Sequence, residues 1–226
     1  MLDPVTTAVV TIAGEELILL PERAIYWPRT NIVLIADWHI GKEATFRTAG
    51  IAVPDGALAA DLDRLSQVID QTGAARLIIL GDLIHAAHGR TPAVLETLLS
   101  WRTRHKSLNI DLIRGNHDRG AGDPPPDWDM TSQATASIMP FVLTHHPVSS
   151  AAGYVLAGHL HPSATLAGRG RQKLTLPCFW FGSAVGVLPA FGSFTGNATI
   201  RPASGDRVFV VMPEAVLPVA LTAVSR

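Results

Sequence analysis

Five apolar runs along the chain each end on a polar side chain. They cover residues 31–37, 76–82, 109–116, 141–146 and 154–161. Within each run, apolar residues follow one another without the alternation of a half-exposed strand, a pattern typical of strands buried on both faces. Each run closes on an aspartate, an asparagine or a histidine. The pattern therefore predicts several buried strands with chemically active side chains at their carboxyl ends.

Helical patterns separate the first three runs. Residues 55–73 place leucine and isoleucine at helical spacing and end on a glycine, a common helix stop. Residues 91–106 start with a Thr-Pro pair that suits the N-cap and the first helical position. This alternation predicts an α/β fold with right-handed crossovers. Residues 173–196 and 207–212 are rich in β-forming residues, so we expect a second sheet packed on the first.

Composition narrows the class of protein. The chain has 226 residues, of which 47% are hydrophobic and 16% charged, so we expect one folded domain over residues 1–226. A net charge of -1 gives no overall basic character that would mark a nucleic-acid-binding protein. The single cysteine fits a reducing compartment. Without a basic leader or a run of about 18 apolar residues, we expect a cytoplasmic protein with no membrane span.

Side chains that bind metals gather at the ends of the runs. In open α/β sheets the functional crevice lies beyond the carboxyl ends of the strands, so we expect the run ends to meet there. In an extended segment, residues i and i+2 point the same way, so D-x-H and H-x-H pairs can reach one centre. Nitrogen and oxygen ligands without a thiolate suit Mn²⁺, Fe or Zn²⁺ rather than a structural zinc site. The candidates are Asp37, His39, Asp82, Asn116, His117, His145, His159 and His161.

The order of these motifs, D-x-H, GD, GNHD, H and GH-x-H, resembles the calcineurin-like metallophosphoesterase superfamily. Residues 24–28, 41–56 and 188–196 also look like the PdeM branch, the ligase-associated DNA damage response endonucleases, and this similarity covers nearly the whole chain. The resemblance implies a two-layer β sandwich flanked by helices (αββα) and hydrolysis of phosphodiesters in DNA during repair. It also implies a partnership with a DNA ligase and a helicase, and superfamily relatives often form homodimers.

The resemblance assigns the ligands to two ions. The first ion would take Asp37, His39, Asp82 and His161, and the second Asp82, Asn116, His145 and His159, with Asp82 bridging. Metal-activated hydroxide would attack phosphorus while His117 protonates or stabilises the leaving oxygen. Mn²⁺ is the expected metal, with Fe and Zn²⁺ as alternatives. The family pattern favours His145 over His146, which alternation would turn to the other face of the segment.

Several neighbours of the motifs are open to two interpretations. Asp118 either orients the catalytic His117 through a hydrogen bond or closes the turn. Gly115 is expected to allow a sharp bend at the strand end. Basic residues near the motifs, together with one further histidine, either contact the substrate or are ordinary surface groups. This substrate-facing set comprises Arg114, Lys42, Arg47 and His85, with a basic loop at residues 169–173.

Three functions are compatible with this ligand set. The leading hypothesis is a phosphodiesterase or endonuclease that acts on DNA. A small-molecule phosphatase or nucleotide phosphodiesterase would use the same ligands, and the width and lining of the mouth would separate it from a DNA enzyme. The second alternative is a non-catalytic scaffold that binds metal.

Overall fold

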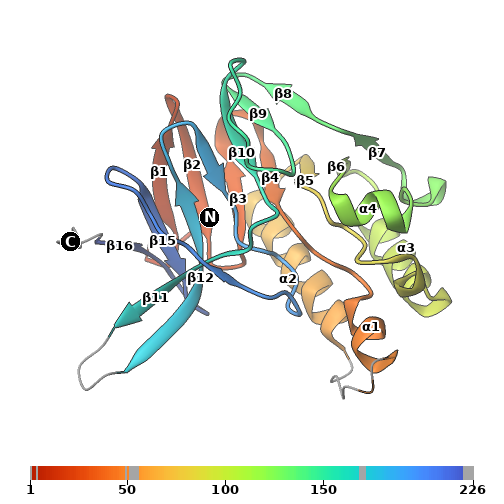
Figure 1. The fold of residues 1–226 in the computed structure, drawn as a ribbon. Helices are drawn as coiled ribbons and strands as arrows, with labels where there is room; N and C mark the ends of the chain where they lie inside the picture. Colours follow the sequence, from red (N-terminus) through yellow and green to blue (C-terminus); the bar gives the residue numbers. More distant parts are fainter. Residues whose placement is uncertain (1, 4, 49, 51–55, 168–171, 221–226) are drawn as a thin grey trace.

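Two β-sheets packed face to face form the centre of the molecule (Figure 1). The structure is a computed structural model that describes the chain apart from residues 1, 4, 49, 51–55, 168–171 and 221–226. The seven-stranded sheet contains, in spatial order, β1 (Ala8–Ile12), β2 (Glu15–Leu20), β3 (Ala24–Trp27), β4 (Ile32–Ile35), β5 (Arg76–Ile79), β6 (Asn109–Ile113) and β7 (Met130–Gln133). The nine-stranded sheet contains β14 (Ala198–Thr199), β11 (Pro162–Ala167), β12 (Lys173–Phe181), β13 (Val185–Val187), β10 (Tyr154–Ala157), β9 (Phe141–Leu143) and β8 (Ala136–Ile138), and β15 (Arg207–Val211) and β16 (Val216–Val219) extend it from β12.

The parallel half of the seven-stranded sheet has the predicted alternation of strand and helix. Strands β4 to β7 pair in parallel, with α2 (Ala57–Thr72) between β4 and β5 and α3 (Pro92–Arg104) between β5 and β6. Both predicted helices are confirmed to within two residues, because their end signals are local. Gly73 ends α2 in the left-handed conformation (φ 64°), and the Thr91 side chain accepts a hydrogen bond from the Val94 N–H at the start of α3. The shorter helices are α1 (Lys42–Thr48), α4 (Asn116–Ala121), and the 3₁₀ turns η1 (Pro28–Thr30), η2 (Ala87–Gly89) and η3 (Pro126–Trp128).

The strands differ from the sequence pattern in two ways. The antiparallel strands β1 to β3 have no counterpart among the predicted elements. Ala13 and Gly14 join β1 to β2 with φ values of 49° and 84°, the signs of a type I′ turn, and alanine is an unusual first residue for it. The five predicted strands do form, but each ends two to four residues before its apolar run does, because the chain turns out of the sheet there. For example, β4 ends at residue 35 and its run at 37, whereas β10 ends at residue 157 and its run at 161.

Side chains of the central strands alternate between two apolar layers. Leu34 of β4 packs between the sheets in a cluster that includes Phe141 of β9 and Phe179 of β12. Its neighbours Val33 and Ile35 belong to the cluster beneath α2 and α3. Strand β4 is therefore buried on both faces, as its uninterrupted apolar pattern predicts.

The larger helices lie on one side of the sandwich. Helices α2 and α3 pack against the seven-stranded sheet (Figure 1). The outer face of the nine-stranded sheet carries smaller clusters around Val155 and Cys178, and these contain no helical residue of the described chain. The predicted α/β sandwich is confirmed, with its helices against one outer face. Among the helices that the structure describes, none is both long and apolar enough to span a membrane.

Candidate metal centre

Loops at the carboxyl ends of strands from both sheets meet at one place. The segments after β4, β5 and β6 come from the seven-stranded sheet, and those after β9 and β10 come from the nine-stranded sheet. His161 Nε2 lies 3.2 Å from His39 Nε2 and 3.6 Å from Asp37 Oδ1. Around Asp82 Oδ2 lie the Nε2 atoms of His145 (3.5 Å), His39 (3.8 Å) and His117 (4.0 Å). His145 Nε2 also lies 3.0 Å from Asn116 Oδ1 and 3.0 Å from His159 Nδ1. The structure thus brings all eight candidate side chains together.

The backbone at these side chains is not extended, which corrects the expected geometry of the D-x-H and H-x-H pairs. The φ values are 53° for Asp37, 54° for His39, 52° for Asp82, 73° for His159 and 47° for His161. Residues with side chains rarely adopt this left-handed conformation, and it concentrates at functional sites. Paired side chains therefore converge because the loops curl around the centre.

A glycine precedes a candidate ligand in three motifs, and each leaves room for a neighbouring polar side chain. A Cβ atom on Gly115 would lie 2.1 Å from Asp82 Oδ1, and one on Gly81 would lie 2.1 Å from His145 Nδ1. A Cβ atom on Gly158 would lie 2.5 Å from Asp37 Oδ2. Gly115 has an ordinary φ of -89°, so the chain direction at this strand end does not depend on the conformational freedom of glycine. Close approach, rather than backbone freedom, requires glycine at that position.

The donor set fits divalent cations. Asp37 is fully buried, and its Oδ1 atom has no hydrogen-bond partner, although burying an unpaired carboxylate oxygen is costly. Ligand atoms of Asp37, His39 and His161 lie within 4.8 Å of one another, as do those of Asp37, Asp82 and His145. Neighbouring ligands of one ion with bonds of about 2.1 Å lie about 3.0–3.4 Å apart. The shorter separations in the cluster match that range, so cations would satisfy the facing lone pairs.

Backbone carbonyls fix the orientation of three histidine rings. The Nδ1–H group of His145 donates to the Leu80 carbonyl (3.0 Å), that of His161 to the Gly196 carbonyl (3.0 Å), and that of His117 to the His85 carbonyl (2.7 Å). A carbonyl oxygen only accepts, so the proton of each neutral ring lies on Nδ1 and the Nε2 lone pair is free. This is the usual arrangement around histidines that ligate a metal.

Burial lowers the pKa of two neighbouring histidines at the site, His39 and His85. Burial, followed by the neighbouring histidines and Lys42, lowers the pKa of His39 to about 2. Burial and His117 lower the pKa of His85 to about 4. Burial also disfavours protonated His161, but Asp37 and the Gly196 carbonyl outweigh it, so the pKa of His161 is raised. A neutral imidazole is the form that ligates a metal, so the lowered pKa of His39 favours its ligating form.

Asp118 is a backbone acceptor. Its carboxylate accepts hydrogen bonds from the N–H groups of Gly115 (2.8 Å), Asp82 (2.8 Å) and Ile84 (3.2 Å). The His117 ring donates to the His85 carbonyl instead of to Asp118. These contacts favour the turn-closing interpretation over an orienting bond to His117. Asp118 therefore acts on the site by fixing the backbone of Asp82.

The expected substrate-facing residues have different surroundings. Lys42 is the first residue of α1. Burial lowers the pKa of the Lys42 ammonium, and the nearby Asp82 carboxylate opposes that decrease. The ring of His85 lies 3.3 Å from His39 (Nδ1 to Nδ1) and stacks on His117 at 4.7 Å between centroids. The guanidinium of Arg114 binds both carboxylate oxygens of Asp123 (2.6 and 2.7 Å), which argues against a free substrate-binding role. The Arg47 side chain and residues 169–171 lie outside the described residues.

The two adjacent histidines after β9 differ in burial. His145 is buried and contacts both aspartates. His146 is exposed, yet its ring centroid lies 4.3 Å from that of His159. Alternation does not turn His146 away from the centre, so that argument is wrong for this segment. Burial and the Leu80 carbonyl distinguish His145 as the better oriented ring.

A second buried polar cluster, which we call the Asp61 network, fixes the loop of residues 190–196 beside the centre. The loop hydrogen-bonds to the backbone of residues 36 and 37, and its Gly196 carbonyl orients His161. On its other side, Asp61 accepts a hydrogen bond from the Ser193 N–H (3.1 Å) and pairs with Arg64 (2.9 Å). Arg64 also donates to the Phe191 carbonyl. The sequence analysis missed this network, because Asp61 and Arg64 look like an ordinary helix-surface pair.

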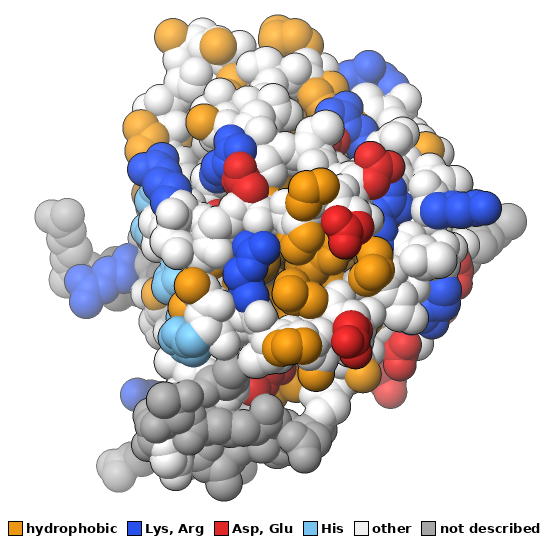
Figure 2. All heavy atoms as spheres, turned by 90° about the vertical axis from the view of Figure 1, so that its right-hand side faces the viewer, with side chains coloured by type: hydrophobic (Ala, Val, Ile, Leu, Met, Phe, Trp, Pro, Cys, Tyr) orange, Lys and Arg blue, Asp and Glu red, His pale blue; other side chains and the backbone are white. Residues whose placement is uncertain are grey.

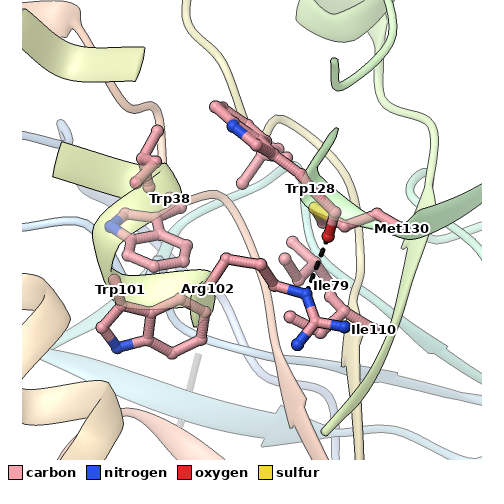
Figure 3. Close-up of a pocket in the computed structure, with 9 residues that line it drawn as sticks. Trp38, Ile79, Trp101, Arg102, Ile110, Trp128 and Met130 are labelled. Carbon is pink, nitrogen blue, oxygen red and sulfur yellow. Dashed lines mark hydrogen bonds between the residues drawn. The ribbon is translucent and has the colours of Figure 1, made fainter. Parts of the chain in front are cut away.

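An apolar cavity of about 20 Å³ lies beside Trp38, the residue between Asp37 and His39. Figure 3 shows Trp38, Trp101, Trp128 and Met130 around it, with the Arg102 Nε–H group donating to the Trp128 carbonyl (2.7 Å). Trp38 is 4% exposed and belongs to the core cluster beneath the helices. The cavity is too small for a substrate, and the packing of Trp38 in this cluster holds the segment between Asp37 and His39 against the core.

The surface next to the centre has mixed charge. Figure 2 shows histidine side chains at one edge of the helical side, with lysine or arginine side chains close to them. Acidic and basic side chains alternate over the rest of that face. The basic side chains near the histidines are therefore part of a face of mixed charge, in agreement with a net charge of -1.

Comparisons with known proteins identify a family model and a similar solved structure. Residues 30–138 match the family model of calcineurin-like phosphoesterases. The crystal structure of Pseudomonas putida nuclease MPE is 42% identical, with a TM-score of 0.83 over 95% of this chain and 100% of that chain. AQ665 from Aquifex aeolicus, a protein of unknown function, is 16% identical, with a TM-score of 0.38 over 57% of this chain and 78% of that chain. Yfce, a phosphoesterase from E. coli, is 17% identical, with a TM-score of 0.40 over 84% of this chain and 99% of that chain. Both are too dissimilar to support an argument. No curated protein matches the chain significantly.

Proposed function

The chain belongs to the calcineurin-like phosphoesterase family, and from this premise we propose that it is a metal-dependent nuclease whose substrate is DNA. The observation that carries the proposal is the 42% identity to a nuclease over 95% of the chain. The convergent aspartates and histidines support the hydrolytic part of it. The resemblance seen in the sequence further predicts a repair setting with a DNA ligase and a helicase, and it is compatible with a homodimer.

The proposed site binds two cations with the ligands named from the sequence. One ion would take Asp37, His39, Asp82 and His161, and the other Asp82, Asn116, His145 and His159. Two divalent ions, when bound, neutralise the charge of a phosphodiester and lower the pKa of water toward neutrality. Mn²⁺ is the metal we expect, with Fe or Zn²⁺ as alternatives for the same nitrogen and oxygen donors.

His117 is the proposed acid. Its Nδ1–H group is engaged by the His85 carbonyl, so the acid would be the doubly protonated ring, which gives its Nε2 proton to the leaving oxygen and returns to the neutral form. Nε2 lies 4.0 Å from Asp82 Oδ2, and the ring is more exposed than those of His39, His145 and His161. A phosphate that enters the site from solvent would therefore be within reach of this ring. Lys42 and His85 are the proposed substrate contacts on this side, and the side chain of Arg47 remains a candidate.

The test compares substrates and one variant. Mn²⁺-loaded protein should cleave plasmid or single-stranded DNA faster than it turns over mononucleotides and aryl phosphate monoesters. His117→Ala should bind metal normally but lose about 10²–10⁴-fold in DNA cleavage, the usual contribution of a positioned acid. His105→Ala is the matched control, because that ring bonds to Ser66 away from the centre.

Two outcomes would reject the proposal. Fast monoester turnover without DNA cleavage would identify a small-molecule phosphatase. DNA processing that survives both His117→Ala and Asp82→Asn would exclude this site as the catalyst and leave a metal-bound scaffold.

A further inference from the structure

A groove on the outer side of the nine-stranded sheet opens next to the candidate metal centre. Pro147 and Leu160 line one side, Trp180 and Asp206 the other, and Val185 lies between them. We call it the Trp180 groove; its volume is about 260 Å³. Strand β13 lies between β10 and β12, so the groove follows the sheet away from the loops that end β9 and β10.

Two residues that line the groove are sequence neighbours of histidines at the centre. Leu160 lies between the candidate ligands His159 and His161, and it is 37% exposed although apolar. Pro147 directly follows His146, whose ring packs against that of His159. A polymer whose phosphate reaches these histidines would therefore have the groove beside it, because Leu160 and Pro147 each follow one of the histidines directly in sequence.

The lining of the groove suits a nucleobase rather than a phosphate. Of the described residues that line it, none is a lysine or an arginine, and most are apolar. The Trp180 Nε1–H group donates to Asp206 Oδ2 (2.7 Å), which also accepts from the Ala203 N–H (2.8 Å). These bonds fix the indole and occupy the carboxylate. A rigid aromatic face beside a phosphate-binding centre is the combination that binds single-stranded nucleic acids.

We propose that the Trp180 groove binds one unpaired base of the strand whose phosphate occupies the metal centre, by stacking on Trp180. The proposal rests on the proposed nuclease function. Lys42 places a positive charge near Asp82, whereas the groove begins at Leu160. The phosphate backbone of the nucleic acid would therefore lie near a cation, and its base would lie against an apolar surface. Strand β13 spans only about 7 Å at ~3.3 Å per residue, which limits the groove to about one base. A base inside a duplex cannot enter without leaving its partner, so the groove selects unpaired DNA.

Steady-state cleavage of a single-stranded oligonucleotide, with an aryl phosphodiester as the small reference substrate, tests the proposal. In Trp180→Ala, KM for the oligonucleotide should rise about 5- to 150-fold relative to any change for the aryl diester, the loss expected for one base–aromatic stack. Trp180→Phe should recover most of that loss. Leu174→Ala is the control, since Leu174 is an exposed apolar residue of the same strand outside the groove.

A second measurement avoids dependence on the variant's folding. In wild-type protein labelled with 5-fluorotryptophan, the ¹⁹F resonance that is missing from Trp180→Phe should shift on adding single-stranded oligonucleotide, and less on adding duplex. No selective change in oligonucleotide KM and no shift would overturn the groove while leaving the nuclease proposal standing. A shift with apolar peptide but not with oligonucleotide would assign the groove to a protein partner. Wild-type protein that hydrolyses the aryl diester but no DNA would reject the nuclease proposal instead.

Discussion

Two aspartates, Asp37 and Asp61, are both buried and both contact the loop of residues 190–196, yet their surroundings differ. Asp61 has an arginine beside it, and each of its oxygens has a donor. Asp37 has one oxygen with a donor and one with none, and histidine rings face it. A buried carboxylate whose charge is balanced within the chain serves structure. One without that balance requires a cation from outside.

The largest expected effect comes from Asp82, the other buried carboxylate of the centre. Asp82→Asn should remove most metal binding, because its Oδ2 atom lies within 4.0 Å of three histidines. Saturating Mn²⁺ should stabilise the wild type by about 2.7 kcal/mol at a hundred times Kd. Scanning calorimetry with and without Mn²⁺ should show that this increase disappears in the variant. An equal increase in Asp82→Asn would contradict the proposed ligand set.

Asp61→Asn should separate structure from metal binding. The variant leaves Arg64 without its carboxylate partner, so the free energy of unfolding should fall by about 2–4 kcal/mol. This loss is smaller than for a fully buried pair, because Arg64 is partly exposed. Chemical denaturation measures that loss. The increase in stability with Mn²⁺ should persist. Asp63→Asn is the control on the same helix, because Asp63 is exposed and should change stability by less than about 0.5 kcal/mol. If Asp61→Asn removed the response to Mn²⁺, the two clusters would not be distinct.

Gly115→Ala should weaken the centre through packing alone. Its Cβ atom would meet Asp82 Oδ1 at 2.1 Å and the Asp82 backbone nitrogen at 2.6 Å. Overpacking of this kind costs about 1–3 kcal/mol and should raise the Kd for Mn²⁺, as measured by calorimetric titration. Gly120→Ala meets nothing within 4 Å and lies in α4, so the same change there should leave Mn²⁺ affinity intact and add slight stability. Equal effects at both glycines would show that backbone freedom, not space, matters at residue 115.

Local signals explain which parts of the fold the sequence could predict. The ends of α2 and α3 depend on a glycine and a threonine within one turn, so their bounds were predictable. The β1–β2 hairpin has alanine where asparagine is usual, and its signal was weak. The partners Asp61 and Ser193 lie 132 residues apart, so nothing in either neighbourhood indicates the other.

The candidate site was predictable as a set but not as a geometry. The order of the motifs indicates which side chains meet, because each follows an apolar strand. The left-handed backbone at five of them, the three-way bond of Asp118 and the pairing of Arg114 with Asp123 depend on neighbours distant in sequence or in space. Those features follow only from the three-dimensional arrangement of the chain.

The position of Gly196 has a consequence for the timing of activity during protein synthesis. The candidate ligands extend from Asp37 to His161, and the carbonyl that orients His161 is supplied only at residue 196. A chain still emerging from the ribosome, or one shortened before that residue, lacks a complete centre. In a DNA-cutting enzyme with this layout, the support for His161 would be completed only once residue 196 has been made.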